Sequence, residues 1–365
     1  MSSFDSAENG RGTAADLWRL QSLAPQTLVV SVTRKCPLSC GHCITRSSPN
    51  ASGPVLSADV ANIWAGDFPA MAAEGLKYLT LTGGEPILAL DAVHVLVAAA
   101  SAHGVAAFVV SSGAWARTLD TARRVVQRAG AVANWDLGVD GWHTAQMPIE
   151  RIDYALTAIL ETGGTATVRI CDSPDATEAA RIWNKVNTVV RGRAAILRQS
   201  VRRIGRGVEA IASKAGGGGT LPRRPCVSTG LFVRADGSTG PCCSGLAYEA
   251  RDRHPFTYGE IRRPGALMAA WQAWRRDPLL RIMRLASLAA LEGWLPDTVL
   301  TEARFPEDPC EACVALWSRL APAEARYVSA RAKAPDVATK LDLLEATLEF
   351  SFLRDVHDGE VCSTV

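Results

Sequence analysis

In the stretch Cys36-Pro37-Leu38-Ser39-Cys40-Gly41-His42-Cys43, three thiols lie within eight residues. The stretch follows an apolar run, Leu28 to Val32, that predicts a first buried strand. Zinc or a four-iron cluster usually takes four protein ligands, and no fourth thiol is near in the sequence. Three thiolates would leave one iron of a cluster open to a substrate or cofactor. Zinc held by the three cysteines and His42 is the alternative, although adjacent ligands at 42 and 43 strain a tetrahedral site.

Composition bounds the class of protein. The chain has 365 residues, a length that favours two domains. Its formal net charge of +2 is too small to attract nucleic acid or a membrane surface through overall charge. Ten cysteines in so long a chain do not indicate a disulfide framework, which is typical of small secreted proteins. The first residues lack the features of a signal peptide, and the most apolar stretch, 93–110, is interrupted by His94, His103 and Gly104. We therefore expect a cytoplasmic protein with reduced thiols.

Strand-like runs alternate with helical patterns, which is typical of a parallel sheet with crossover helices. The predicted strands are 28–33, 77–82, 106–111, 133–139, 166–171 and 194–200. The predicted helices are 13–23, 57–74, 89–102, 117–129, 148–162 and 175–188, with more helix within 262–300 and 314–356. This pattern predicts an α/β fold, a partial barrel of six β/α units. Ligands of parallel sheets bind at the carboxyl ends of the strands, so the chemistry is expected in the loops that follow them.

The loop after the second predicted strand reads Gly83-Gly84-Glu85-Pro86. Two glycines let backbone approach a ligand closely, and Glu85 offers an acceptor for an ammonium group. A simple turn into a helix, with Pro86 at its first position, is the alternative.

The two motifs together resemble those of the radical S-adenosylmethionine (SAM) enzymes: Cys-x3-Cys-x2-Cys, and Gly-Gly-Glu-Pro forty residues later. The resemblance implies that Cys36, Cys40 and Cys43 bind a [4Fe-4S] cluster whose open iron is chelated by SAM. One electron from that cluster would cleave SAM to methionine and a 5′-deoxyadenosyl radical. Residues 83–86 would bind the methionine amine. His42 stands where the family usually has an aromatic residue near the adenine.

Further polar residues follow the third and fourth predicted strands. In the family, positions like Ser111 and Ser112 often lie near the SAM ribose, although a strand-to-helix turn explains each serine equally well. Asp140 and His143, three residues apart after the fourth strand, suit contacts to ribose, methionine or substrate. His143 is either a general base or a side chain that anchors its loop.

The fifth predicted strand ends at Arg169, Ile170 and Cys171. This segment resembles the one that flanks adenine in the family, so Arg169 and Ile170 are expected to contact the cofactor. A buried structural thiol is the common alternative for Cys171.

The segment 191–224 carries nine basic residues and one acidic residue, which predicts an anionic substrate held by guanidinium groups at the rim of the barrel. An ordinary solvated surface is the alternative. The segment has no aromatic residue on which bases would stack, so nucleic acid is not expected. Gly216 to Gly219 form a flexible joint, which divides the chain into an N-terminal extension (1–24), a core (25–215) and a second domain (216–365).

Beyond the joint, an Asp236-Gly237 turn predicts a hairpin that brings Cys226 and Cys242 together. Cys310 and Cys313 follow much later. These cysteines resemble the C-terminal extension of SPASM/Twitch radical SAM enzymes, which implies a smaller α+β domain with C-terminal helices and one auxiliary [4Fe-4S] cluster. Zinc is the alternative. Cys243 is the uncertain member, since it could replace Cys242.

The resemblance implies an enzyme that removes a hydrogen atom from an unactivated carbon, with electrons from a donor such as flavodoxin or ferredoxin. The substrate is a ribosomally made peptide, to be crosslinked or epimerised, or else a small molecule such as an antibiotic sugar or cyclitol. In an epimerisation, Cys171 or Cys243 would return the hydrogen atom. The remote alternative is a non-catalytic zinc-binding protein.

Overall fold

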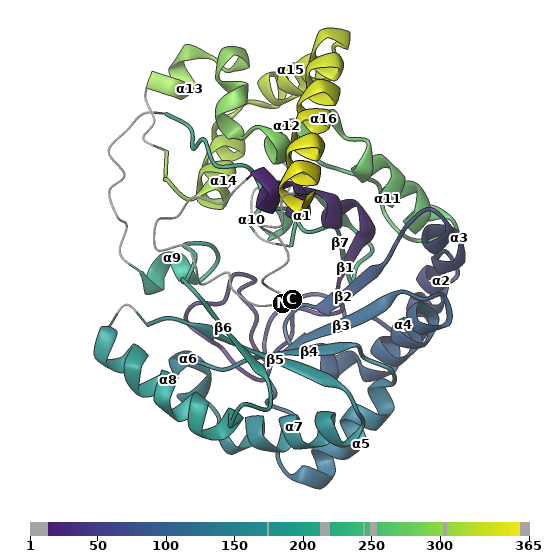
Figure 1. The fold of residues 1–365 in the computed structure, drawn as a ribbon, viewed down its shortest axis with the longest axis vertical. Coiled ribbons are helices and arrows are strands. Elements are labelled where there is room, and N and C mark those ends of the chain that lie inside the picture. The colour runs from purple at the N-terminus through teal and green to yellow at the C-terminus, as the bar shows by residue number, and fades with distance from the viewer. Residues whose placement is uncertain are drawn as a thin grey trace.

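The computed structural model describes residues 14–173, 175–211, 220–243, 245–248, 254–301 and 305–357. Its centre is an eight-stranded sheet in the order β6-β5-β4-β3-β2-β1-β7-β8. Neighbouring strands from β6 to β7 run parallel, and β7 and β8 run antiparallel. β6 and β8 are the two edges, so the sheet is an open, partial barrel with helices packed on its outside (Figure 1).

The six predicted strands are confirmed, with boundaries that differ by at most two residues. The strands are β1 (Thr27–Ser31), β2 (Tyr78–Thr82), β3 (Ala106–Ser111), β4 (Asn134–Gly138), β5 (Thr165–Cys171), β6 (Ala195–Gln199), β7 (Leu231–Arg234) and β8 (Thr239–Gly240). The outer helices are α2 (Ala58–Ala65), α3 (Phe68–Ala73), α4 (Leu90–Ala102), α5 (Leu119–Ala129), α7 (Glu150–Glu161) and α8 (Ala176–Val190). Short helices are η1 (Ala24–Gln26), η2 (Pro86–Ala89), α6 (Gly141–Thr144), α9 (Gly207–Ala210) and α10 (Gly245–Tyr248).

A second group of helices lies above the sheet in Figure 1. It comprises α1 (Ala14–Leu23), α11 (Ala266–Arg275), α12 (Pro278–Leu285), η3 (Leu288–Trp294), α13 (Asp297–Thr301), α14 (Pro309–Arg319), α15 (Pro322–Ala332) and α16 (Pro335–His357). The N-terminal helix α1 therefore lies among C-terminal helices. Among the described residues, no helix combines the length and the apolar character that crossing a membrane requires.

Alternation along β1 separates the two faces of the sheet. Leu28 and Val30 are fully buried in the main core between the sheet and its outer helices. Val29 points to the opposite face, where it packs with Phe232 of β7 and Cys243. Side chains of successive strand residues alternate in this way, so this second face is the inside of the partial barrel.

The helix predicted over 57–74 is instead two helices, α2 and α3, that meet at Gly66 and Asp67. Asp67 does not cap α3 with its side chain; its carboxylate accepts from the backbone N–H groups of Gly265 and Met268, at 2.8 and 3.0 Å. These donors lie at the start of α11. A long-range cap, which sequence periodicity does not reveal, thus fixes the break.

The predicted hairpin after the joint is confirmed. Asp236 and Gly237 turn the chain between β7 and β8, with Gly237 at φ +83°, and Asp236 Oδ1 accepts from the N–H of Ser238 at 2.9 Å. Because β7 pairs in parallel with β1, this hairpin extends the core sheet. The glycine joint 216–219 lies outside the described residues, as do residues 1–13 and Cys362, so the boundary at 215 stays a prediction.

Candidate active site

The three-cysteine loop follows β1. Cys36 and Cys40 are buried, Cys43 is half-buried, and all three are free thiols. Burial raises the pKa of Cys36 to about 12, and the charges of Glu85, Cys40 and Cys43 add to this effect, against a hydrogen bond from the N–H of Leu38. Such clustered thiols favour a cation that offsets their charge, which iron or zinc would supply.

Gly83 and Gly84 pack against the backbone that enters the cysteine loop. A Cβ on Gly83 would lie 2.3 Å from the carbonyl oxygen of Thr33, and one on Gly84 would lie 2.1 Å from that of Lys35. The N–H of Gly84 donates to Thr33 O at 2.7 Å, and that of Glu85 to Lys35 O at 2.9 Å. The glycine loop therefore fixes the position of the cysteine loop.

Glu85 is 1% exposed and joins the loops after β2 and β3. Its Oε1 accepts from Ser111 Oγ at 2.8 Å, and its Oε2 from the N–H and Oγ of Ser112 at 3.0 and 2.5 Å. Burial raises the pKa of Glu85, and these hydrogen bonds oppose that effect. Pro86 starts η2 and is buried, and Glu85 caps this short helix through the N–H of Ile87. The structure joins Glu85, Ser111 and Ser112 to one another, and their contacts to SAM stay a prediction.

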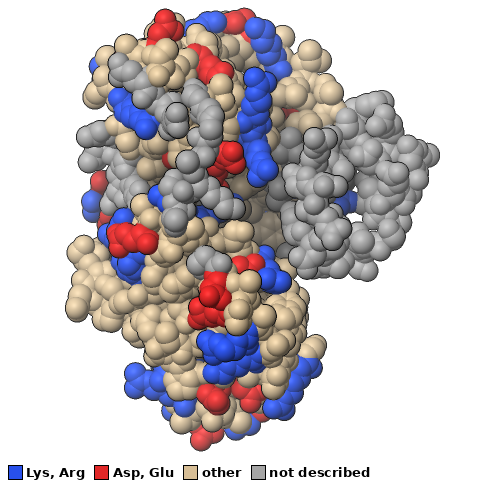
Figure 2. Space-filling model, turned by 90° about the vertical axis from the view of Figure 1, so that its left-hand side faces the viewer, with Lys and Arg blue, Asp and Glu red and all other residues tan. Residues whose placement is uncertain are grey.

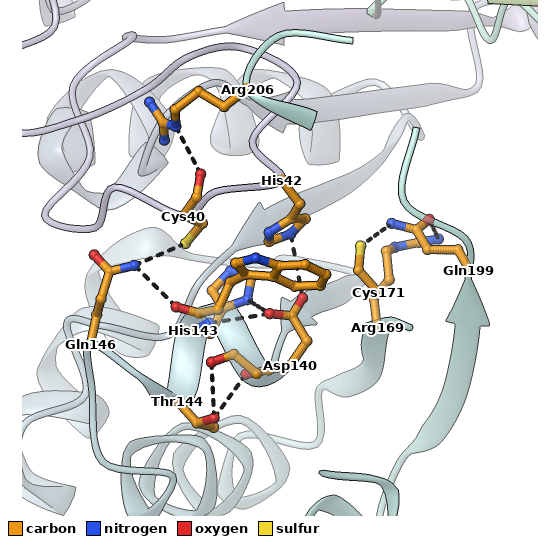
Figure 3. A network of polar contacts seen from close by, with 12 residues as sticks. Cys40, His42, Asp140, His143, Thr144, Gln146, Arg169, Cys171, Gln199 and Arg206 are labelled. Carbon is orange, nitrogen blue, oxygen red and sulfur yellow. Dashed lines mark hydrogen bonds and ion pairs between the residues drawn. The ribbon is translucent and has the colours of Figure 1, made fainter. Parts of the chain in front are cut away.

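His42 lies against the loop after β4 (Figure 3). Its Nε2 is 3.4 Å from Asp140 Oδ2, and its ring lies 4.7 Å from the Trp142 ring and 5.3 Å from the His143 ring. Burial lowers the pKa of His42, which favours the neutral ring. The buried Nδ1 of His42 has no hydrogen-bond partner among the described residues, so it can take one polar contact from a bound molecule. This orphaned nitrogen beside the cysteines fits a cofactor such as SAM.

Asp140 is the centre of this group. Its Oδ1 accepts from Nδ1 of His143 at 2.8 Å and from the His143 N–H at 3.1 Å. Burial by itself would raise the pKa of Asp140, but the hydrogen bond from His143 and the charge of His143 outweigh burial and lower this pKa. Burial by itself would lower the pKa of His143, but hydrogen bonds to Asp140 and Cys40 raise this pKa to about 10. The structure thus shows His143 anchoring its loop and touching a cluster cysteine.

Three residues near the cysteines were missed by sequence reasoning. Trp142 packs on Gly41, where a Cβ would lie 3.1 Å from the indole. Gln146 accepts from the Ser39 N–H at 2.7 Å and donates to Cys40 Sγ at 3.7 Å. Arg206, which the sequence grouped with a basic surface, donates to the carbonyl oxygens of Cys40 and Ser47 at 2.8 and 2.6 Å. No local sequence pattern indicates these contacts, because each joins residues that are far apart in the chain.

A second polar network lies on the inner face of the sheet, at the ends of β4 to β6. Asp136 pairs with Arg169, whose Nη1 donates to Gln199 Oε1 at 3.2 Å. Gln199 Nε2 in turn donates to Cys171 Sγ at 3.0 Å, and burial raises the pKa of that thiol to about 12. Cys171 also interacts with the charge of Asp140, so the network borders the His42 site. Ile170 points to the opposite face, into the main core, which does not support the predicted cofactor contact.

The predicted auxiliary cysteines gather between the sheet and the C-terminal helices. Cys313 interacts with the charges of Cys226, Cys242 and Cys310, and none of the four forms a disulfide. Burial raises the pKa of Cys226 to about 12 and that of Cys313 well above its ordinary value. Four thiols whose charges interact, one of them buried and three half-buried, fit a tetrathiolate metal group.

Cys243 points away from this group. It packs with Val29 and Phe232 on the inner face of the sheet, and its Sγ lies 3.7 Å from Thr229 Oγ1. Among the charges that raise its pKa is that of Cys310. The structure therefore groups Cys242, rather than Cys243, with the other three.

The basic segment is largely engaged within the fold. The partners are Thr188 O for Arg191, Asp153 for Arg193, Asp172 for Arg198, Asp308 for Arg202, Glu311 for Arg203 and Cys40 O for Arg206. Over the described part of the face in Figure 2, basic and acidic side chains are interspersed. These arginines hold loops together, and an anionic substrate stays a prediction.

Comparisons with known proteins agree with the first site. Residues 26–158 match the family model described as a 4Fe-4S single cluster domain. Over 101 residues the chain is 35% identical to the PqqA peptide cyclase of Rhizobium meliloti (strain 1021). That match covers 28% of this chain and 25% of the length of the relative.

Two solved structures are also similar. Native anSMEcpe with bound AdoMet is 12% identical, with a TM-score of 0.48, and the match covers 87% of this chain and 99% of that one. BtrN in complex with AdoMet and 2-DOIA is 10% identical, with a TM-score of 0.43, covering 73% and 89%.

The matched 4Fe-4S domain contains both the three-cysteine motif and the Gly-Gly-Glu-Pro loop that packs against it. This match supports the resemblance of both motifs to those of the radical SAM enzymes.

Proposed function

We propose that the protein uses the three-cysteine site to hold a [4Fe-4S] cluster with SAM and removes a hydrogen atom from a ribosomally made peptide. The observation that carries this proposal is the buried cysteine loop, with the glycine loop on one side and His42 and Asp140 on the other. When bound, the cluster and SAM supply the one-electron chemistry that yields a carbon-centred radical. The chain's own residues hold the cofactor, align the substrate and exclude water.

The roles follow from the contacts. Cys36, Cys40 and Cys43 would ligate iron, and Nδ1 of His42 would take a polar contact from SAM. Asp140 orients the His42 ring through Nε2. Glu85 is saturated by the loop after β3, so its role is to hold the two loops in register; SAM would meet the backbone of 83–86.

A peptide substrate is supported by the PqqA peptide cyclase, the relative to which part of the chain is 35% identical. The Asp136–Arg169–Gln199 network on the inner face offers fixed donors and acceptors for a peptide backbone or a polar side chain. We place the substrate beside this network.

The test is SAM cleavage. Protein reconstituted anaerobically with iron and sulfide, then given SAM and dithionite, should release 5′-deoxyadenosine. The triple variant Cys36→Ala/Cys40→Ala/Cys43→Ala should release none, whereas the matched variant Cys226→Ala/Cys242→Ala should still release it. Release by the first variant at the rate of the parent would refute the proposal.

The four auxiliary cysteines would hold a second [4Fe-4S] cluster. The parent should then contain about eight irons per chain and the three-cysteine variant about four, as two four-iron clusters require. One zinc with only four irons in the parent would show that the second site is a zinc site.

Cys171 and Cys243 stay proposed hydrogen-atom donors if the reaction is an epimerisation. The S–H would give its hydrogen atom to the substrate radical, and one electron and one proton from the cluster and solvent would restore the thiol. Replacing the donor by Ala should divert the product while SAM cleavage continues. Unchanged epimerisation in both single variants would exclude the role.

A further inference from the structure

Two arginines flank the auxiliary cysteines from different parts of the chain. Arg202 lies after β6, and its Nη1 donates to Cys310 Sγ at 3.4 Å and to Asp308 Oδ2 at 3.0 Å. Asp308 also caps α14 through the N–H groups of Cys310 and Glu311. The guanidinium is therefore held against one of the four thiols by a carboxylate that is itself fixed.

Arg284 lies on α12, on the side of Cys226. It is 5% exposed, donates from Nε and Nη2 to the side-chain and backbone oxygens of Gln21, both at 2.7 Å, and stacks over Trp274 at 5.3 Å. Gln21 also donates to the carbonyl oxygen of Cys226 at 3.2 Å.

The charge of Arg284 has no close counter-ion in the described part of the chain, where it forms no ion pair with a carboxylate. The titratable groups that act on it are Cys226, Glu345, Arg281 and Tyr258. Glu345 is already paired with Arg281, at 2.6 Å. Burying a cation without a counter-ion costs free energy. A negative charge on the Cys226 side of Arg284 would therefore stabilise the fold. Four metal-bound thiolates would supply it.

We propose that Arg202 and Arg284 set the reduction potential of the auxiliary cluster, making it a better electron acceptor. One-electron reduction adds one negative charge to a group that is already anionic. A nearby cation and an N–H···S hydrogen bond both stabilise the reduced form, so both raise the potential. The inference rests on the proposed auxiliary cluster and is independent of SAM cleavage at the first site.

The experiment uses the full chain with Cys36→Ala/Cys40→Ala/Cys43→Ala, so that the auxiliary cluster is the one that reports. Its midpoint potential is measured by dithionite titration followed by electron paramagnetic resonance. Arg202→Gln and Arg284→Met should each lower the potential at unchanged iron content, with the larger shift for Arg284→Met because no carboxylate offsets that charge. Arg275→Gln, whose guanidinium pairs with Glu74 instead, is the matched control and should cause no shift.

Arg284→Met removes a buried charge and its stacking contact, so Arg284→Lys is measured beside it. Arg284→Lys keeps the charge, and its midpoint potential should therefore lie close to that of the parent. The exposed fraction of the Arg202 side chain is 43%, so its variant is expected to fold. Potentials equal to that of the parent in both Arg202→Gln and Arg284→Met would overturn the proposal, and if Arg284→Met does not fold, an unchanged potential in Arg202→Gln overturns it. Zinc in place of iron would overturn it too, while 5′-deoxyadenosine release by the unmodified chain would leave the first site intact.

Discussion

Gly84 has no room for a side chain, because its Cα faces the backbone of Lys35, one residue before the first cluster cysteine. A Cβ there would lie 2.1 Å from the Lys35 carbonyl oxygen, which must then move, and the cysteine loop with it. Gly84→Ala should therefore reduce the iron bound at the first site, measured as iron content in a Cys226→Ala/Cys242→Ala background. Gly293→Ala, where a Cβ meets nothing within 4 Å, is the control. Full iron loading in Gly84→Ala would contradict the role of the close approach.

Glu85 is a buried acceptor that receives donors from Ser111 and Ser112. Glu85→Gln replaces one acceptor oxygen by an N–H2 group that faces donors, so one buried hydrogen bond is lost. The free energy of unfolding should fall by about 1–3 kcal/mol. Chemical denaturation measures it, and the exposed Asp120→Asn should change it by a few tenths of a kcal/mol at most. Equal stability of Glu85→Gln and the parent would show that the carboxylate is replaceable.

At the scale of single elements, α12 supports the auxiliary site. Asp277 caps its start by accepting from the N–H groups of Leu279 and Leu280, and it accepts from Tyr258 Oη at 2.8 Å. The same helix accepts the N–H of Cys226 at Met283 O, at 2.8 Å.

Asp277→Ala should destabilise α12 by about 1 kcal/mol and lower metal loading of the auxiliary site. The matched control is Asp175→Ala, which removes the cap of α8, on the outside of the barrel. Both variants should lose similar stability in thermal unfolding, but Asp277→Ala alone should lose auxiliary iron. Loss of iron to the same extent in both would show a general effect of destabilisation.

At the scale of the whole molecule, the central sheet joins both parts of the chain. Leu231, Phe232 and Val233 of β7 are fully buried beside β1. A fragment of residues 1–215 would expose the edge of β1 and the apolar surface around it, which favours aggregation. We expect this fragment to be insoluble or to unfold without a cooperative transition, as measured by calorimetry. Cooperative unfolding near the temperature of the full chain would show that the core is an independent domain.

Much of this architecture could be predicted from local sequence. The six core strands are buried apolar runs, each followed by a helical pattern, and such periodicity depends only on nearby residues. The hairpin at Asp236-Gly237 follows from turn chemistry in the same way. The single helix predicted over 57–74 was wrong, because Asp67 caps α11, which lies about two hundred residues further along the chain.

The sequence by itself determined the three-cysteine motif, the glycine loop and the order of the six β/α units, since each depends on short spacings. Only the tertiary structure decided what these residues touch. It packs Gly84 on Lys35, turns Arg206 toward the Cys40 carbonyl, pairs β7 with β1, and separates Cys242 from Cys243. These contacts join residues far apart in the chain, and the physical reason is that close packing and the pairing of buried polar groups select partners by position in space, which no local pattern records.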